Sequence, residues 1–242
     1  MRYQLYYWPD IQGRGEFIRL ALEQAGANYL DVARLPAQDG MGMPAMMDLL
    51  QNSAVTTAPF APPFLKAGKL LIAQTANILF FLGPRLNLVP EDDASWLWAN
   101  QLQLTIADLV TEVHDTHHPI AGSLYYKDQK AEAMRRARFF IAERMPKFLN
   151  YFEHLPVLKA KDAPHLIGDA LSYVDLSMFQ IIAGLRYAFP QAMRHQEPEY
   201  PRLLALHALV ASDPRIAAYL ASPRRLPFNK KGIFRHYAEL DA

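Results

Sequence analysis

The apolar residues near the start of the chain change their spacing in a way that predicts a strand, a helix and a second strand. Residues 3–8 are rich in aromatic side chains, which favour strands. In residues 14–25 the apolar side chains recur at helical spacing, and Gly26 is a residue that commonly ends a helix. Residues 29–32 form a second short strand-like run. The pattern predicts a β-α-β unit.

A second group of apolar runs predicts two strands joined by a tight turn and followed by a helix. Residues 64–65 and 70–72 are apolar and flank Gly68, which can adopt the positive φ that hairpin turns need. Gln74 and Thr75 then open a helix. The apolar face of that helix is formed by Ile78, Leu79 and Leu82. The order β-α-β, a connection, then β-β-α is typical of a thioredoxin-like domain.

The connection between the two units, residues 35–61, is expected to be irregular, because it combines prolines with small residues and shows no clear period. Its methionines are interpreted as gap-filling packing residues: Met41, Met43, Met46 and Met47.

The rest of the chain is predicted to be helical, after a linker at residues 84–93 that has turn residues at both ends. A long helix is indicated by one apolar face, made of Leu102, Ile106, Leu109 and Val113. Further helices are expected at residues 129–150, 173–189, 201–212 and 214–221. We therefore expect a thioredoxin-like α/β domain in residues 1–83 and an all-helical domain in residues 94–242.

One of these helices carries a recognisable start signal. Ser172 can accept a hydrogen bond from the third helical N–H, and Asp175 can reach back to the N–H of Ser172. This capping box predicts a structural role for Asp175 rather than a catalytic one.

Composition and charge indicate which kinds of molecule the protein is expected to bind. The chain has 242 residues, of which 51% are hydrophobic, and its net charge is +1. A nearly neutral chain gives no reason to expect nucleic acid. No apolar run is long enough to span a bilayer, and the start lacks the apolar region of a signal peptide. The chain has no cysteine, so no protein thiol can act as nucleophile. We expect a cytoplasmic protein without membrane or nucleic-acid partners.

The predicted β-β-α unit carries the first candidate chemistry. Pro63 stands just before its first strand, and proline is the residue that most readily forms a cis peptide bond. The free N–H groups at the start of the helix suit a carboxylate ligand, next to the amide of Gln74 and the hydroxyl of Thr75. The unit resembles the glutathione-binding half of the glutathione transferases. In that family a cis-proline opens the unit and a Gln-Ser pair holds the γ-glutamyl group of glutathione. An ordinary βα turn is the alternative.

The resemblance extends to residues 7–19, which are similar to the first strand and helix of the mu, pi and sigma classes of these enzymes. Tyr7 matches the catalytic tyrosine of the family. A phenol can donate a hydrogen bond to a developing thiolate, which lowers the pKa of the glutathione thiol. Tyr6 is the competing candidate, but adjacent strand residues face opposite ways, so Tyr6 is expected to pack inward.

Two departures from the family pattern concern the binding of glutathione. The region that normally supplies a cation for the glycine carboxylate contains no Lys or Arg between Pro36 and Leu65. The residue before the cis-proline normally pairs with the cysteinyl backbone of glutathione through both N–H and C=O. Here it is Pro62, which can accept but cannot donate. The resemblance therefore implies weaker binding, or partial binding elsewhere.

The helical part offers further candidates. Glu112 resembles an acid that reaches the γ-glutamyl amine across a dimer interface in related classes, although an exposed helix acid is the plain alternative. His114 and His118 are four residues apart and could share a metal, but no third ligand is apparent, so no metal is expected. The basic, aromatic residues 223–237 are expected to pack across the cleft mouth. The expected electrophile pocket comprises Trp8, His114, His118, Phe228 and Phe234.

The resemblance implies a homodimeric glutathione transferase. Glutathione would be the co-substrate, and its thiolate would attack a soft, small hydrophobic electrophile. Two alternatives remain open on the same fold. One is a non-enzymatic glutathione-binding or regulatory protein, since fold does not fix function. The other is a glutathione-dependent isomerase or peroxidase using the same site.

Overall fold

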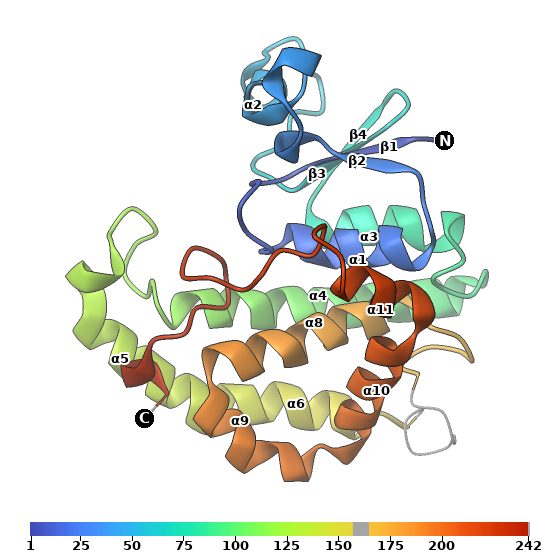
Figure 1. Ribbon diagram of the computed structural model, residues 1–242. Coiled ribbons are helices and arrows are strands. Elements are labelled where there is room, and N and C mark those ends of the chain that lie inside the picture. Colours follow the sequence, from blue (N-terminus) through green and yellow to red (C-terminus); the bar gives the residue numbers. More distant parts are fainter. Residues whose placement is uncertain (157–164, 242) are drawn as a thin grey trace.

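The protein is described by a computed structural model in which a small sheet with its own helices sits above a larger group of helices (Figure 1). The structure describes residues 1–156 and 165–241. Both the thioredoxin-like part and the all-helical part predicted from the sequence are present, so the predicted fold class is confirmed.

The sheet has four strands in the order β2-β1-β3-β4. Their bounds are Tyr3–Tyr6 for β1, Tyr29–Asp31 for β2, Phe64–Ala67 for β3 and Leu70–Ala73 for β4. β1 pairs with β2 in parallel and with β3 in antiparallel orientation. Gly68 makes the turn between β3 and β4 with a φ of +62°, as the sequence predicts.

Helices cover both faces of this sheet. On one face α1 (Gly15–Gln24) and α3 (Thr75–Arg85) bury an apolar layer. That layer comprises Leu5, Ile18, Leu22, Leu65, Ile78 and Leu82, among others. On the other face lies α2 (Gly42–Gln51), which packs Met46 against the layer of Tyr6 and Phe64.

The expectation that residues 35–61 are irregular is therefore wrong for their middle part. After a 3₁₀ turn at Val32–Arg34, the segment itself forms the short 3₁₀ turn Ala37–Asp39 and then the helix α2. A sheet face that must be covered by apolar residues imposes a helix that local periodicity does not indicate. The interpretation of Met46 as a packing residue is confirmed, since it is fully buried.

The helical part is built around α8, whose side chains are nearly all buried between its neighbours α1, α4 and α10. The helices are α4 (Asp93–Asp115), α5 (Lys130–Phe139), α6 (Met145–Glu153), α8 (Tyr173–Ala188), α9 (Pro190–Gln196), α10 (Pro201–Ser212) and α11 (Pro214–Leu220). Short 3₁₀ turns occur at Tyr126–Gln129, Glu197–Glu199 and Ala238–Leu240, and a π-helical turn at Phe140–Arg144 joins α5 to α6.

Two predicted boundaries differ from the structure. Helix α3 continues through Pro84 to Arg85 and so enters the predicted linker, because a proline in a last turn removes little of the helix. Helix α4 ends at Asp115, so His117 and His118 lie in the turn beyond it rather than on it. The division into domains at residues 83 and 94 stays a prediction.

The capping box at the start of α8 is confirmed. The hydroxyl of Ser172 accepts a hydrogen bond from the N–H of Asp175 at 3.3 Å, and one oxygen of Asp175 accepts from the N–H of Ser172 at 2.7 Å. The other carboxylate oxygen accepts from the N–H of Leu166 at 2.7 Å. Asp175 is fully buried and acts as a structural residue, as expected.

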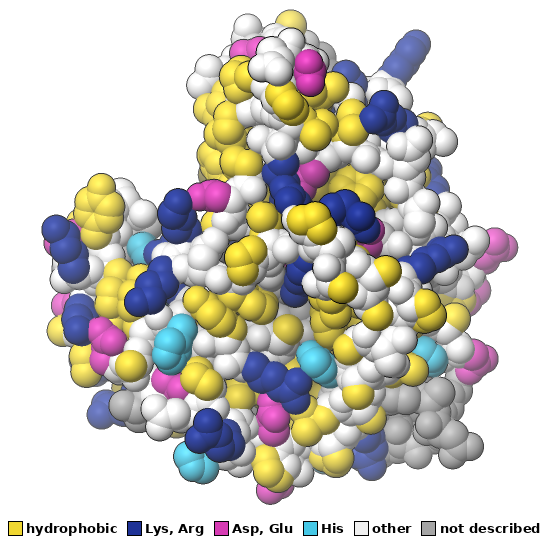
Figure 2. Space-filling model, in the orientation of Figure 1, with side chains coloured by type: hydrophobic (Ala, Val, Ile, Leu, Met, Phe, Trp, Pro, Cys, Tyr) yellow, Lys and Arg dark blue, Asp and Glu magenta, His cyan; other side chains and the backbone are white. Residues whose placement is uncertain are grey.

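After α11 the chain crosses the front of the molecule as an extended segment, residues 223–241, which we call the tail (Figure 1, red). Figure 2 shows Lys and Arg side chains interspersed with apolar ones on this face. The tail is anchored at both ends. Arg225 binds the buried carboxylate of Glu16 at 2.5 Å, and Asp241 accepts hydrogen bonds from the N–H groups of Gln191 and Ala192 at the start of α9.

The carboxylate of Glu16 belongs to a buried charged network beneath the tail. It also accepts a hydrogen bond from the hydroxyl of Tyr219 at 2.5 Å and pairs with Arg19 at 3.2 Å. Arg19 in turn pairs with Asp31 at 2.7 Å. Buried charges are tolerated when they are paired and hydrogen-bonded in this way. The network joins α1, β2, α11 and the tail.

Among the described residues, no single helix is long and apolar enough to cross a membrane. Only α10 and α11 taken together have the length and apolar composition of a membrane span, and the two helices are bent by 79° where they meet.

Candidate functional site

Tyr7 follows β1 and is buried, with its hydroxyl directed at the turn before α1. The oxygen accepts a hydrogen bond from the backbone N–H of Arg14 at 2.8 Å. A hydroxyl has one proton to donate and can accept as well, so this contact leaves the proton of Tyr7 free for another partner. Burial raises the pKa of Tyr7, against the opposing effects of the Arg14 hydrogen bond and of the charges on Arg14 and Arg19.

Tyr6 faces the opposite side of the sheet, as expected. Its ring stacks on Phe64 with centroids 4.7 Å apart, and its hydroxyl donates to the side chain of Gln4 at 3.2 Å. The expectation that Tyr6 packs inward is confirmed.

Two glycines make the space that Tyr7 occupies. A Cβ at Gly13 would lie 2.1 Å from the hydroxyl oxygen of Tyr7, and a Cβ at Gly15 would lie 2.6 Å from its ring. Gly13 also has a φ of +46°. The sequence contains both glycines, but only the structure shows that both leave room for the side chain of Tyr7.

A cavity of about 660 Å³ lies between the start of α3 and the outer face of α4. It is lined by Arg14, Gln74, Thr75, Ala76, Asn77, Phe80, Asn100, Leu104, Ala107 and Thr111. Arg14 therefore contacts Tyr7 through its backbone and lines the cavity as well. No motif in the sequence marks Arg14 as a ligand-binding residue; its place in the turn between Gly13 and Gly15 is the only local signal.

The residues predicted to hold the γ-glutamyl group lie at one end of this cavity. Gln74 precedes α3 with a φ of +70°, which is uncommon for a residue with a side chain. The Thr75 hydroxyl oxygen is buried and has no hydrogen-bond partner among the described residues. Strained backbone and an unpaired polar group are both common where a ligand binds. The peptide bond between Pro62 and Pro63 is cis, which confirms that expectation.

Glu112 is held by two arginines of its own chain. Arg144 contacts its carboxylate at 2.6 Å and Arg136 at 3.2 Å. Partial burial opposes ionisation, but the hydrogen bonds and charges of Arg144 and Arg136 prevail and lower the pKa of Glu112. The structure thus gives Glu112 an internal role, and its contact across a dimer interface stays a prediction.

The side expected to take the electrophile is filled by the tail. Phe234 is buried against Gly184, and Phe228 stacks on Tyr187 with centroids 5.0 Å apart. The space left between the tail and the turn at Gly13 is only about 10 Å³. That is about the room of one water molecule. In this conformation Phe228 and Phe234 pack in place of lining an open pocket, while Trp8 is 37% exposed.

Three lysine and arginine side chains of the tail are engaged in ion pairs. Lys231 pairs with Asp10 at 2.8 Å, Arg224 with Glu23 at 2.9 Å, and Arg225 with Glu16 at 2.5 Å. Any of these three residues would have to leave its partner in order to bind the glycine carboxylate of glutathione.

Comparisons with known proteins agree with this architecture. Residues 114–223 match the family described as "Glutathione S-transferase, C-terminal domain". A glutathione S-transferase of Plasmodium falciparum is 24% identical over 225 residues, covering 90% of this chain and 94% of its own. Glutathione S-transferase P of Bos taurus is also 24% identical, covering 95% of this chain and 98% of its own.

Solved structures give the same fold. A pi-class glutathione S-transferase of Onchocerca volvulus superposes with a TM-score of 0.67 at 22% identity, covering 90% of this chain and 92% of its own. The glutathione S-transferase from Ascaris lumbricoides gives a TM-score of 0.64 at 21% identity, covering 95% and 99%. The structure is therefore a glutathione transferase fold. Along nearly its full length the chain is also similar in sequence to glutathione S-transferases.

Proposed function

We propose that the protein is a glutathione transferase in which the Tyr7 hydroxyl stabilises the thiolate of glutathione for attack on a soft hydrophobic electrophile. The observation that carries the proposal is the hydrogen bond from the Arg14 N–H to the Tyr7 oxygen at 2.8 Å. This contact uses a lone pair of the phenol and leaves its proton available to the sulfur.

The raised pKa of Tyr7 suits this role. Because burial favours the neutral phenol, Tyr7 keeps its proton at neutral pH and can act as a hydrogen-bond donor. A donor aimed at a developing thiolate favours ionisation of the thiol, whose proton passes to solvent. The thiolate sulfur then forms a bond to the electrophilic carbon, and the leaving group departs with its electron pair.

The cavity beside α3 would hold the peptide part of glutathione. The first N–H groups of α3, the Gln74 amide and the unpaired Thr75 hydroxyl would receive the γ-glutamyl carboxylate. The carbonyl of Pro62 would accept a hydrogen bond from the cysteinyl amide. The positive charge of Arg14 at the same cavity adds attraction for an anionic ligand. A homodimer in the cytoplasm remains the predicted state of the protein.

The experiment compares Tyr7→Phe with Tyr6→Phe, using glutathione and a generic aryl halide. Loss of a donor of this kind lowers turnover ~10- to 1000-fold. We expect that loss for Tyr7→Phe and near-parent turnover for Tyr6→Phe, because the Tyr6 hydroxyl bonds only to Gln4 among the contacts described. Calorimetric titration with glutathione should show little change in either variant. Equal turnover of Tyr7→Phe and the parent would contradict the assignment.

The tail supports a second candidate, a glutathione-binding protein without conjugating activity. It packs Phe228 and Phe234 where an electrophile would be expected to enter. A protein of this kind would be retained on immobilised glutathione and would not turn over aryl halides. If peroxides or isomerisable substrates are turned over instead, a glutathione-dependent peroxidase or isomerase is the better description.

A further inference from the structure

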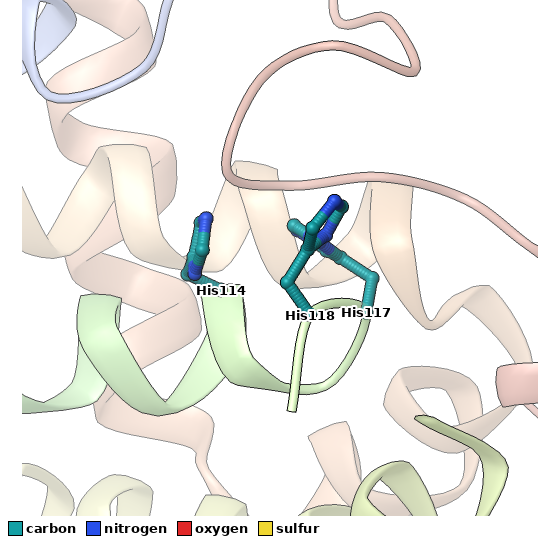
Figure 3. A group of neighbouring side chains, drawn as sticks. All are labelled: His114, His117 and His118. Carbon is teal, nitrogen blue, oxygen red and sulfur yellow. The ribbon is translucent and has the colours of Figure 1, made fainter. Parts of the chain in front are cut away.

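Three histidines converge where α4 ends, beneath the tail (Figure 3). One ring nitrogen from each of His114, His117 and His118 lies within 4.8 Å of the others. The Nδ1 atoms of His117 and His118 are 2.5 Å apart. The chain turns back immediately after the helix, with the N–H groups of both residues donating to the carbonyl of His114 at 3.2 and 3.3 Å.

This turn explains why the sequence indicated only two of the three. On a continuous helix His114 and His118 share a face, and His117 lies on the neighbouring side. Because α4 stops at Asp115, the turn brings the His117 ring to the same place. The structure therefore supplies a third nitrogen ligand, His117, which the spacing of histidines in the sequence did not indicate.

The hydrogen bonds around the cluster fix which nitrogens carry lone pairs. The Nε2 atom of His117 lies 2.8 Å from the carbonyl oxygen of Ile233 in the tail. A carbonyl only accepts, so Nε2 carries the proton and the lone pair of His117 is on Nδ1, where it faces Nδ1 of His118. The Nδ1 atom of His114 lies 3.3 Å from a carboxylate oxygen of Asp115, which leaves Nε2 free in the same way. Metal-binding histidines commonly use a carbonyl or carboxylate like this.

The charges around the cluster act in both directions. Burial first, and then the charge of Arg235, lower the pKa values of His117 and His118. A nearby guanidinium opposes a bound cation. The Arg235 side chain, however, donates to the carbonyls of Gly232 and Lys231 at 2.7 and 3.0 Å, and Asp115 adds a negative charge beside His114.

We propose that His114, His117 and His118 form a binding site for a zinc-like divalent transition-metal ion, with a fourth position left for water or a bound molecule. Zinc–nitrogen bonds of about 2.0–2.1 Å place tetrahedral ligands roughly 3.3 Å apart. In the structure the Nδ1 atoms of His117 and His118 are 2.5 Å apart, and one nitrogen from each of the three rings lies within 4.8 Å of the others. A ligand set of imidazoles selects zinc, cobalt, nickel or copper over magnesium or calcium.

The site is separate from the chemistry at Tyr7 and does not depend on the proposed transferase activity. Its connection to the rest of the molecule runs through His117, whose proton is shared with the tail carbonyl of Ile233. An ion bound to Nδ1 of His117 makes its Nε2–H a stronger donor. Metal binding would therefore tighten the attachment of the tail to the end of α4.

The test uses the full chain without a polyhistidine tag, freed of metal by a chelator. Cobalt(II) is added and the visible absorption of tetrahedral cobalt is followed, and zinc is then titrated by calorimetry. We expect one ion per chain, with zinc displacing cobalt. His114→Ala and His118→Ala should each weaken binding at least ~10-fold, since even outer partners of metal ligands contribute 10- to 100-fold. The control is His195→Ala, because His195 is exposed on α9.

Thermal melting of each variant without metal shows whether it is folded. His114→Ala and His118→Ala are preferred to a change at His117, which is buried and bonded to the tail. Lack of binding below millimolar metal by the folded parent would overturn the proposal. So would unchanged affinity in folded His118→Ala, or an equal loss in His195→Ala, either of which would reveal an adventitious ion only.

Discussion

At the scale of single residues, Tyr7 is positioned by two neighbouring glycines, which have no side chains. Its hydroxyl and ring fill the volume that side chains at Gly13 and Gly15 would take, and the backbone between them supplies the N–H of Arg14. The reactive phenol is thus oriented by backbone atoms, which cannot change rotamer. A group held in this way costs no reorganisation when charge develops next to it.

Replacing Gly13 by alanine should displace Tyr7 and lower turnover. The added Cβ would lie 2.1 Å from the Tyr7 oxygen. A misplacement of about 1 Å can cost ~100-fold in rate, and we expect a loss of at least ~10-fold in kcat. Gly40→Ala is the matched control, because Gly40 also has a positive φ, +69°, but nothing lies within 4 Å of its Cβ position. Steady-state kinetics with an aryl halide measure kcat for both variants. Similar kcat values would contradict the role of Gly13 in positioning Tyr7.

A half-buried histidine should make the fold sensitive to acid. His207 stacks on Phe179, and burial, with the charge of Arg186, lowers its pKa to about 4. The folded pKa is below the unfolded value of about 6.5, so the stabilisation is present above pH 6.5 and is lost as pH falls towards 4. We expect roughly 1–2 kcal/mol from this group, discounted for its partial exposure.

Chemical denaturation at several pH values measures this effect. His207→Gln should flatten the dependence of the unfolding free energy on pH between 6.5 and 4. Some dependence of the unfolding free energy on pH will remain. The pKa of His117 is lowered to about 2, so His117 also stabilises the fold less as pH falls. An unchanged slope in a folded His207→Gln protein would show that His207 is not a source of the acid sensitivity.

At the scale of elements, the start of α8 depends on one buried carboxylate. Asp175→Ala would leave the N–H groups of Leu166 and Ser172 without their acceptor. Each unpaired buried donor costs about 1–3 kcal/mol, so we expect a loss of about 2–5 kcal/mol in the free energy of unfolding. Asp92→Ala removes the exposed cap of α4 and should cost much less, because water can replace the lost acceptor. Urea denaturation compares the two, and equal losses would contradict the buried role.

The elements that the sequence predicted well are those with strong local signals. The four strands, α1, α3 and α8 follow period, turn chemistry or capping, which act over a few residues. Helix α2 was missed because the sheet face decides its structure. The π-helical turn at Phe140–Arg144 interrupts a helix predicted as continuous, and no local pattern distinguishes the two.

The residues of the candidate site also fall into those with a local sequence signal and those without one. Tyr7, Gln74 and Thr75 stand in short motifs, so their sequence neighbours suffice to single them out. Arg14 and the His117 ligand depend on how the chain turns in three dimensions. The position of the tail depends on contacts with residues about 200 positions earlier, such as that between Arg225 and Glu16. Such long-range pairs leave no pattern in one sequence.

At the scale of the whole molecule, the chain is predicted to form a homodimer. Phe60 is 95% exposed, and Leu97 and Leu104 of α4 are 67% and 51% exposed. Large apolar side chains in the open often mark an interface between proteins. We expect light scattering to give the mass of a dimer at micromolar concentration. Phe60→Lys should shift the protein towards monomer, whereas Leu70→Lys, at a 54% exposed position on β4, should not. A monomeric parent would contradict the prediction.

The anchoring of the tail bears on the order in which the protein can mature during synthesis. Glu16 and Arg19 are made early, yet two partners of Glu16, Tyr219 and Arg225, leave the ribosome about 200 residues later. Until then an acid destined for the interior must stay hydrated. The N-terminal half can collapse around its sheet during translation, but its junction with α11 can close only after the tail has emerged. That junction is therefore among the last parts of the described fold to form during synthesis.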